Sequence, residues 1–189
     1  MRKIILNLAV TLDGFIEGPN GEIDWFRMDE NSGTESFFNQ FLSGIDTIFY
    51  GRISYDLWGQ YQPAGDTSLS EKKIWEAVHS KNKYVFSRKP KEDGKATYIS
   101  FDVVDKVNEI KNQPGKDIWL YGGANLITHF MNYGLIDNYL LAVFPIILGA
   151  GKPLFANIKN RIGLKFNYAE TSESGVLLIS YDTLPLTVV

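Results

Sequence analysis

Residues 117–127 constrain the fold of this chain more than any other stretch, because the apolar pattern changes period there at a pair of glycines. Residues 118–121 form an apolar run of strand length. After Gly122 and Gly123, apolar residues recur at helical spacing, and Gly134 follows as a stop signal. The stretch therefore predicts a buried strand, a tight glycine junction and a helix.

This junction has two interpretations. Two glycines between a strand and a helix allow unusual backbone dihedrals or a close approach to a ligand. The first turn of the helix then offers unpaired N–H groups and the positive end of its dipole, which suit an anion. A tight turn packed against a neighbouring element would carry the same residues. On this stretch alone, both interpretations stay open.

Length and composition limit the class of protein. The length of 189 residues suits one domain, residues 1–189, with a substantial core. The net charge of −3 gives no basic surface for nucleic acid. The apolar run at residues 4–10 is short and interrupted by Asn7, which favours a first strand over a signal peptide, and no run reaches the ~20 residues of a membrane span. Because cysteine is absent, disulfide and thiolate chemistry are excluded, and we expect a cytoplasmic protein.

Two more strand ends carry residues that suit phosphate. A predicted strand at residues 46–50 is followed by Gly51 and Arg52, which repeats the glycine junction and adds a fork of donors. A predicted strand at residues 83–86 ends in Ser87, Arg88 and Lys89, a hydroxyl with two cations. A surface ion pair at Arg52, or a solvated strand end at Ser87, would have the same sequence.

The order of the elements predicts an α/β fold. Strands alternate with helices through most of the chain, including a helix that Asp102 is expected to cap, and one that follows the capping-box spacing of Ser68 and Glu71. In the strand-like run at residues 136–148, Pro145 indicates an edge, a bulge or a strand end. Residues 164–169 and 176–181 predict a terminal hairpin. We therefore expect a mostly parallel sheet with an antiparallel edge.

Three strand ends, near residues 51, 87 and 122, then lie on one side of this sheet. Open α/β sheets bind their ligands on the side where the parallel strands end. Glycine, hydroxyl and arginine at three such ends favour a phosphorylated ligand such as a nucleotide. The chain contains no G-x-G-x-x-G, so an ordinary Rossmann fingerprint does not explain the pattern.

Short motifs follow one another in a recognisable order across nearly the whole chain. They are Thr11-Leu12-Asp13-Gly14-Phe15-Ile16, Gly51-Arg52-x-Ser54-Tyr55, Val85-Phe86-Ser87-Arg88, Leu120-Tyr121-Gly122-Gly123-Ala124, and residues 137–145 with Leu148-Gly149-x-Gly151 and Pro153-Leu154-Phe155. Each motif is weak alone, and the ordered set resembles the dihydrofolate reductase-like superfamily. Within it the chain looks closest to the reductase domain of the bacterial bifunctional riboflavin-biosynthesis deaminase/reductase, without the deaminase.

This resemblance implies a three-layer fold and an NADPH-dependent reductase that transfers hydride to a small pyrimidine- or pterin-like substrate. In such enzymes the hydride chemistry belongs to the cofactor, and the protein positions it. The implied cofactor residues share the carboxyl ends of the strands. By the family pattern, the cofactor phosphates meet Gly51, Arg52 and Ser54, and the 2′-phosphate is held by Ser87 and Arg88. The pyrophosphate is approached by Gly122 and Gly123, which the family joins by a cis peptide, beside Ala124, Asn125 and Leu126. The nicotinamide is flanked by Ala9 and Ile16.

Two carboxylates are candidates for the proton source. Asp13 matches the aspartate that lies near the substrate in the riboflavin reductases, and we rank it first; the alternative is a turn residue. Glu35 falls where dihydrofolate reductases carry a pterin-binding carboxylate, which could relay a proton. Leu141, at the position of that carboxylate's polar partner, cannot form a hydrogen bond through its side chain. A solvent-facing Glu35 that stabilises a helix N-terminus is the alternative.

The substrate side is less well defined. Trp25, Phe38 and Tyr55 are candidates to line it, with core packing as the alternative for each. Residues 25–26 and 28–33 supply no obvious extra cations for a ribose-phosphate tail, so our hypothesis is a reductase of this family with a diverged substrate.

Rival functions remain. Dihydrofolate reductase proper requires a buried Glu35, whereas a non-catalytic nucleotide-binding module would bind NADPH without hydride transfer. A metal hydrolase finds little support, because His79 and His129 are far apart and lack a paired ligand spacing. The resemblance also implies a homodimer, which we expect to form through an exposed strand at residues 139–144.

Overall fold

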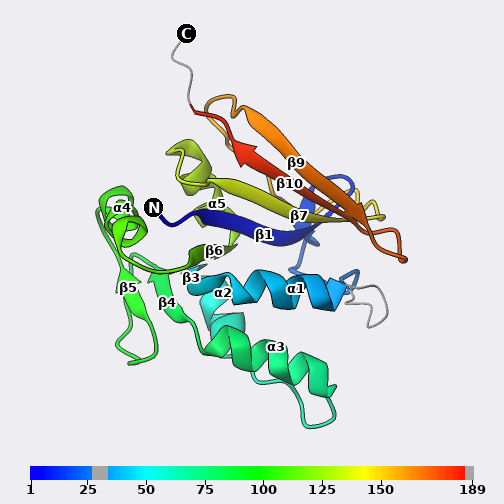
Figure 1. The fold of residues 1–189 in the computed structure, drawn as a ribbon, viewed down its shortest axis with the longest axis horizontal. Helices are drawn as coiled ribbons and strands as arrows, with labels where there is room; N and C mark the ends of the chain where they lie inside the picture. The colour runs from blue at the N-terminus through cyan, green and yellow to red at the C-terminus, as the bar shows by residue number, and fades with distance from the viewer. Residues whose placement is uncertain (27–33, 186–189) are drawn as a thin grey trace.

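The structure is a computed structural model that describes residues 1–26 and 34–185, with an eight-stranded sheet between two layers of helices (Figure 1). In spatial order the strands are β5 (Thr97–Ile99), β4 (Asn82–Phe86), β3 (Ile45–Gly51), β6 (Asp117–Gly122), β1 (Ile4–Thr11), β7 (Asn138–Phe144), β10 (Leu177–Thr183) and β9 (Leu164–Thr171). The first six run parallel, whereas β10 is antiparallel to both β7 and β9. This topology confirms the predicted three-layer α/β fold with an antiparallel hairpin at its edge.

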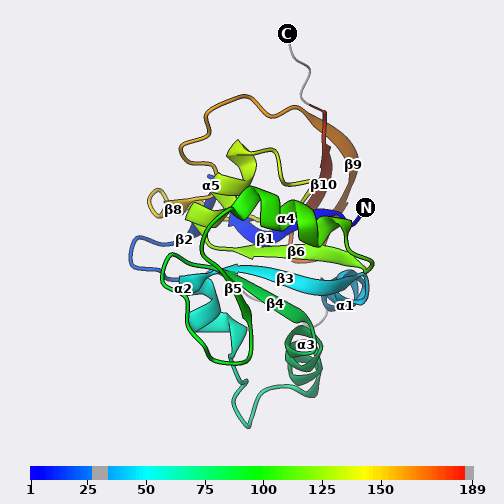
Figure 2. The same ribbon diagram turned by 90° about the vertical axis from the view of Figure 1, so that its left-hand side faces the viewer.

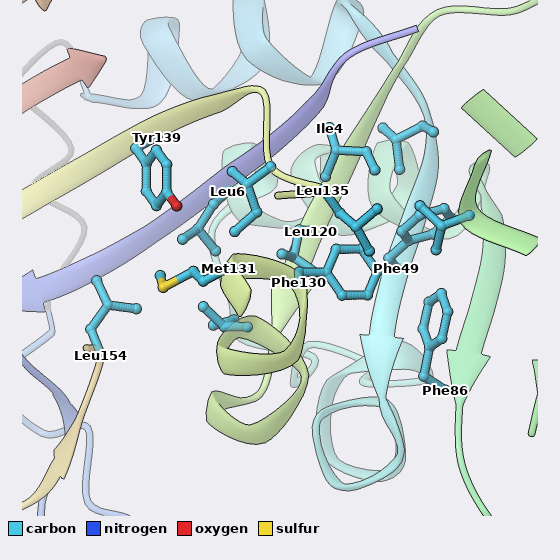
Figure 3. Close-up of a cluster of buried hydrophobic side chains, with 14 of the residues drawn as sticks. Ile4, Leu6, Phe49, Phe86, Leu120, Phe130, Met131, Leu135, Tyr139 and Leu154 are labelled. Carbon is cyan, nitrogen blue, oxygen red and sulfur yellow. The ribbon is translucent and has the colours of Figure 1, made fainter. Parts of the chain in front are cut away.

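The sheet separates two hydrophobic cores. The helical segments are α1 (Thr34–Ser43), α2 (Arg52–Ser54), the π-helical turn η1 (Tyr55–Gly59), α3 (Leu69–His79), α4 (Val103–Asn112) and α5 (Ala124–Asn132). Figure 2 shows α4 and α5 on one face of the sheet and α1 and α3 on the other. On the first face, Phe130 of α5 packs with Leu6 and Leu120 of the central strands (Figure 3). On the second face, Leu42 and Ile74 are buried against the same strands. None of the described helices is both long and apolar enough to cross a bilayer.

Local signals account for the start of α3 and the end of α5, but not for the start of α4. The Ser68 hydroxyl accepts a hydrogen bond from the Glu71 backbone N–H at 3.2 Å, and this confirms half of the predicted capping box. Gly134 adopts a left-handed φ of 62° after α5, as expected of a stop signal. The prediction that Asp102 caps α4 is wrong: its φ is 49° and its side chain makes no capping bond. The left-handed turn at Asp102 directs the chain from β5 into α4, and its side chain does not reach the helix N–H groups.

The late strand β7 is shorter than predicted and lies inside the sheet. It ends at Phe144, directly before Pro145. Hydrogen-bonded neighbours flank it on both sides, β1 on one and β10 on the other. The expectation of an exposed strand at residues 139–144 is therefore wrong, because the terminal hairpin adds to the sheet there. The free edge on that side is β9, whose residues are exposed except for the half-buried Tyr168.

A partly buried ion pair joins the amino ends of the strands. The Lys111 side chain is 7% exposed and that of Asp137 is 32% exposed, and Lys111 Nζ lies 2.7 Å from Asp137 Oδ2. The same carboxylate oxygen accepts a hydrogen bond from the backbone N–H of Ile4 at 2.7 Å. Asp137 therefore ties α4 to the start of β1 just before β7 begins.

Candidate cofactor and substrate site

The two glycine junctions meet on the carboxyl side of the sheet, where the parallel strands end. A Cβ placed on Gly51 would lie 3.1 Å from the backbone nitrogen of Gly123 and 3.4 Å from the carbonyl oxygen of Gly122. A Cβ on Gly123 would lie 3.0 Å from the Ser54 hydroxyl oxygen. Side chains at these glycines would fill the space between the ends of β3 and β6. The chain thus leaves bare backbone where a ligand could approach closely.

The start of α5 completes this junction. The peptide bond between Gly122 and Gly123 is cis, and Gly122 has a φ of 124°, in the region that favours glycine. The helix begins at Ala124, and the N–H groups of Leu126 and Ile127 already bond to the Gly123 carbonyl at 2.9 and 3.0 Å. The backbone N–H groups in the first turn that precede Leu126 have no backbone acceptor within the described chain. Such groups at a helix N-terminus suit a phosphate or another anion.

Arg52 lies beside this junction in a surface ion pair. Its Nη1 is 2.8 Å from Asp56 Oδ2, while Lys91 Nζ is 2.7 Å from Asp56 Oδ1. Hydrogen bonds from Lys91 and then Arg52 lower the pKa of Asp56. All three side chains are partly exposed, so the ion pair gives little stability. It does hold two cations near the end of β3.

The end of β4 offers a different arrangement. The Ser87 backbone N–H donates to the Ile99 carbonyl at 3.0 Å, which fixes this strand end against β5. The Ser87 hydroxyl accepts from the backbone N–H of Lys89 at 3.0 Å and donates to the Lys89 carbonyl at 2.8 Å. Arg88 is exposed and forms no ion pair with any residue that the structure describes. Its guanidinium is therefore available to an anionic ligand.

Asp13 ties two loops together. Its Oδ1 accepts from the Thr11 hydroxyl at 2.6 Å and from the Leu148 N–H at 3.2 Å, and its Oδ2 accepts from the Gly149 N–H at 2.8 Å. The hydrogen bond from Thr11 makes the largest contribution to lowering the pKa of Asp13. The side chain is thus an ionised acceptor at neutral pH. These contacts account for Asp13 as a loop tie, and the catalytic assignment stays a prediction.

The tie formed by Asp13 is expected to control loop opening. In Asp13→Ala, the amides of Leu148 and Gly149 should exchange with deuterium at least several-fold faster, because both lose their acceptor. Since the folded-state pKa of Asp13 is lowered, the tie is complete above the carboxyl's ordinary pKa and is lost as pH falls through the lowered value. Hydrogen exchange measures both effects. Unchanged exchange at Leu148 and Gly149 would contradict the account, and the Leu135 amide serves as a distant control.

The aromatic candidates on the substrate side differ in their surroundings. Phe38 packs edge-on against Trp119 at 5.5 Å, and Tyr55 is wholly buried with its hydroxyl donating to Asp93 at 3.1 Å. Both therefore belong to the core on the α1 side of the sheet, which was the alternative interpretation. Trp25 is half-buried against Phe144 at 5.4 Å, and its buried indole N–H has no partner in the described chain.

The remaining candidates are placed less completely. Ala9 and Ile16 are half-buried; Ala9 pairs with Ala142 of β7, and Ile16 packs against the core on the α5 side. The side chain of Glu35 and residues 28–33 lie outside the described residues.

Two tyrosines near the glycine junction were not predicted as site residues. Tyr121 immediately precedes Gly122, and its ring lies 4.8 Å from that of Tyr50. The Tyr50 hydroxyl is buried without a hydrogen-bond partner in the described chain. Burial raises the pKa of both phenols, so both are neutral at physiological pH. Their place at the ends of β3 and β6 is the sequence signal that could have identified them.

Two further features lie away from this junction. A cavity of about 350 Å³ opens between α1, the amino halves of β1 and β7 and the carboxyl half of β10, with Gln40, Asn138 and Asp182 in its lining. Among residues 1–26 and 34–185, no three His, Asp or Glu side chains group closely enough to hold a metal ion.

The fold and this glycine-lined carboxyl side define a dihydrofolate reductase-like α/β protein. The profile of the RibD C-terminal domain matches residues 2–178. The chain therefore belongs to the RibD C-terminal domain family, the family of the reductase domains in riboflavin biosynthesis.

Relatives in Bacillus subtilis (strain 168) agree in length with this chain. The uncharacterized protein YyaP is 55% identical over 181 residues, which cover 95% of this chain and 94% of YyaP. The uncharacterized protein YwjB is 31% identical over 166 residues, which cover 87% of this chain and 88% of YwjB. Neither name states an activity.

Solved structures share the fold at low sequence identity. A protein from Shewanella sp. PV-4, described as belonging to riboflavin biosynthesis, superposes with a TM-score of 0.77 at 23% identity, over 98% of this chain and 100% of that chain. A Thermotoga maritima deaminase/5-amino-6-(5-phosphoribosylamino)uracil reductase gives a TM-score of 0.65 at 14% identity, over 97% of this chain and 57% of that chain. This chain therefore matches just over half of the bifunctional protein.

Proposed function

We propose that this protein is an NADPH-dependent oxidoreductase that transfers hydride to a small pyrimidine- or pterin-like substrate. Membership of a reductase-domain family supports the class of reaction. The observation that carries the proposal is the meeting of Gly51, Gly123 and Ser54 beside the first turn of α5. Bare backbone and unpaired helix N–H groups together fit a pyrophosphate.

The residues present fit NADPH on the carboxyl side of the sheet. Gly51, Ser54 and the first turn of α5 would hold the pyrophosphate, and Arg52 would add charge beside it. Arg88, exposed and without an ion pair in the described chain, would hold the 2′-phosphate at the end of β4. When bound, NADPH supplies the hydride, and the chain positions it.

The face of the sheet beside α1 is the expected substrate side. The unpaired indole N–H of Trp25 could donate to a ring carbonyl or nitrogen of the substrate, since a buried donor favours a partner. Tyr121, neutral and next to Gly122, is a second donor near the end of β6. Both groups suit a flat heterocycle with acceptors at its rim.

Turnover with defined substrates tests this function. We expect NADPH oxidation with a small aminopyrimidine, low turnover or none of 5-amino-6-(5-phosphoribosylamino)uracil because its ribose-phosphate tail finds no dedicated cations in residues 25–26 and 28–33, and little with dihydrofolate. NADPH binding without turnover of any of these compounds would favour the non-catalytic nucleotide-binding module. Turnover of dihydrofolate alone would favour dihydrofolate reductase proper.

We also propose a homodimer. The β9 edge is exposed along its length and leaves backbone groups available for an intermolecular contact. Gel filtration should then give about twice the chain mass of 21.4 kDa. A mass near that of one chain would contradict the dimer.

A further inference from the structure

An exposed aromatic ring follows β5 on the carboxyl side of the sheet. Phe101 is 71% exposed, more than any other phenylalanine, tyrosine or tryptophan that the structure describes. It makes no ring contact with another described residue. A single exposed apolar residue is common on protein surfaces and needs no explanation by itself. Phe101 matters here because it follows the strand next to the one that Arg88 follows.

Phe101 leaves the sheet next to Arg88. Phe86 of β4 pairs with Ile99 of β5 in parallel, and the Ser87 N–H bonds to the Ile99 carbonyl. Arg88 and Phe101 each stand two residues beyond this pair, so each follows the end of one of two adjacent parallel strands. An exposed cation without an ion pair in the described chain and an exposed ring without a ring partner thus both lie just beyond neighbouring strand ends.

The backbone beneath Phe101 is held in place. Asp102 turns the chain with a φ of 49°, and its carbonyl accepts from the Lys106 N–H at 2.9 Å as α4 begins. Ile99, on the other side, is buried in the core. Phe101 is therefore presented from a short, fixed connection between a strand and a helix.

We propose that Phe101 is the base platform of the cofactor site, where its ring stacks on the adenine of NADPH. This inference rests on the proposed function. In NADPH the adenine and the 2′-phosphate are attached to the same ribose, so a base held by Phe101 and a phosphate held by Arg88 are neighbours in the ligand as the two residues are in the protein. An aromatic face beside a guanidinium suits this pair of groups.

The test compares Phe101→Ala and Phe101→Trp with the wild type by isothermal titration calorimetry. The probes are NADPH and adenosine 2′,5′-bisphosphate, which carries the adenine and the 2′-phosphate without the nicotinamide. Loss of the stack should raise both dissociation constants by the same factor, about tenfold or more. Phe101→Trp should retain binding. Phe166→Ala is the matched control, because Phe166 is 56% exposed on the opposite edge strand and should leave both constants unchanged.

Each outcome decides the proposal. Equal weakening of both probes, with an unfolding temperature close to the wild type, supports the platform. Unchanged binding in Phe101→Ala overturns the platform and leaves the reductase proposal standing. A much larger loss for NADPH than for the bisphosphate places the effect outside the adenine and also overturns it. Failure of the wild type to bind either probe overturns both the platform and the proposed function.

Discussion

Replacing Gly51 with alanine is expected to weaken NADPH binding at least tenfold and to destabilise the fold by ~1–3 kcal/mol, the usual cost of overpacking. The added Cβ would lie 3.1 Å from the backbone nitrogen of Gly123, and backbone cannot give way as the end of a flexible side chain can. The Gly122–Gly123 junction must therefore shift, and the pyrophosphate would lose its contacts with the backbone there. Tryptophan fluorescence with NADPH and thermal unfolding measure the two effects.

Gly65→Ala is the control for this change. Gly65 lies in a surface loop, and a Cβ there would meet nothing within 4 Å. It should leave both affinity and stability within error of the wild type. Wild-type NADPH affinity in Gly51→Ala would show that the junction does not contact the cofactor.

Removing the carboxylate of Asp137 is expected to cost ~1–3 kcal/mol of the free energy of unfolding, the usual penalty for leaving a buried polar group without its partner, because Lys111 is buried while the Asp137 side chain is 32% exposed. In Asp137→Ala, the Lys111 ammonium stays buried without its partner, and the Ile4 N–H loses its acceptor. Urea unfolding followed by circular dichroism measures the change. A loss below ~1 kcal/mol would contradict the importance assigned to this pair, since that is the size expected of an exposed one.

Two variants separate the partly buried pair from charge effects in general. Glu109 pairs with Lys106 on the exposed side of α4, and Glu109→Ala should change the free energy of unfolding by less than ~0.5 kcal/mol. Adding Lys111→Met to Asp137→Ala should restore part of the lost stability, because it removes the unpaired charge and keeps an apolar stem.

Short-range signals predicted most of the fold. The change from a strand pattern to a helical pattern at Gly122 and Gly123 located β6 and α5, and Gly51 located the equivalent junction after β3. Parallel strands end on the same side of a sheet, so the meeting of Gly51 with Gly123 followed from the order of the elements. The alternating patterns near the C-terminus predicted the antiparallel hairpin, which became β9 and β10.

The features that sequence reasoning missed depend on distant pairing. The two-stranded sheet of β2 (Phe15–Glu17) and β8 (Lys152–Pro153) joins segments with no local strand signal of their own. The same pairing brings Asp13 to Leu148 and Gly149, which no spacing in the sequence reveals. The long apolar run around β7 concealed a strand with partners on both sides, because an inner strand and an apolar edge strand have similar composition.

Side-chain roles were harder to predict than positions. Tyr55 stands in a motif beside Gly51, and the structure buries its ring wholly. Arg52 does form the surface ion pair that was its alternative interpretation, although it lies beside the glycine junction. Local sequence fixes where a residue leaves its element, whereas tertiary packing decides which way its side chain turns.

The most direct test of the account is a titration of intrinsic fluorescence with NADPH and, separately, NADH, for the wild type and Arg88→Ala. The account predicts tighter binding of NADPH than of NADH. Arg88→Ala should weaken NADPH by ~10- to 100-fold, the value of a charge-assisted hydrogen bond, and leave NADH nearly unchanged. Arg161→Ala, an exposed arginine in the loop before β9, should alter neither. Failure to bind either nucleotide, or equal affinity for both, would contradict the NADPH site on the carboxyl side of the sheet.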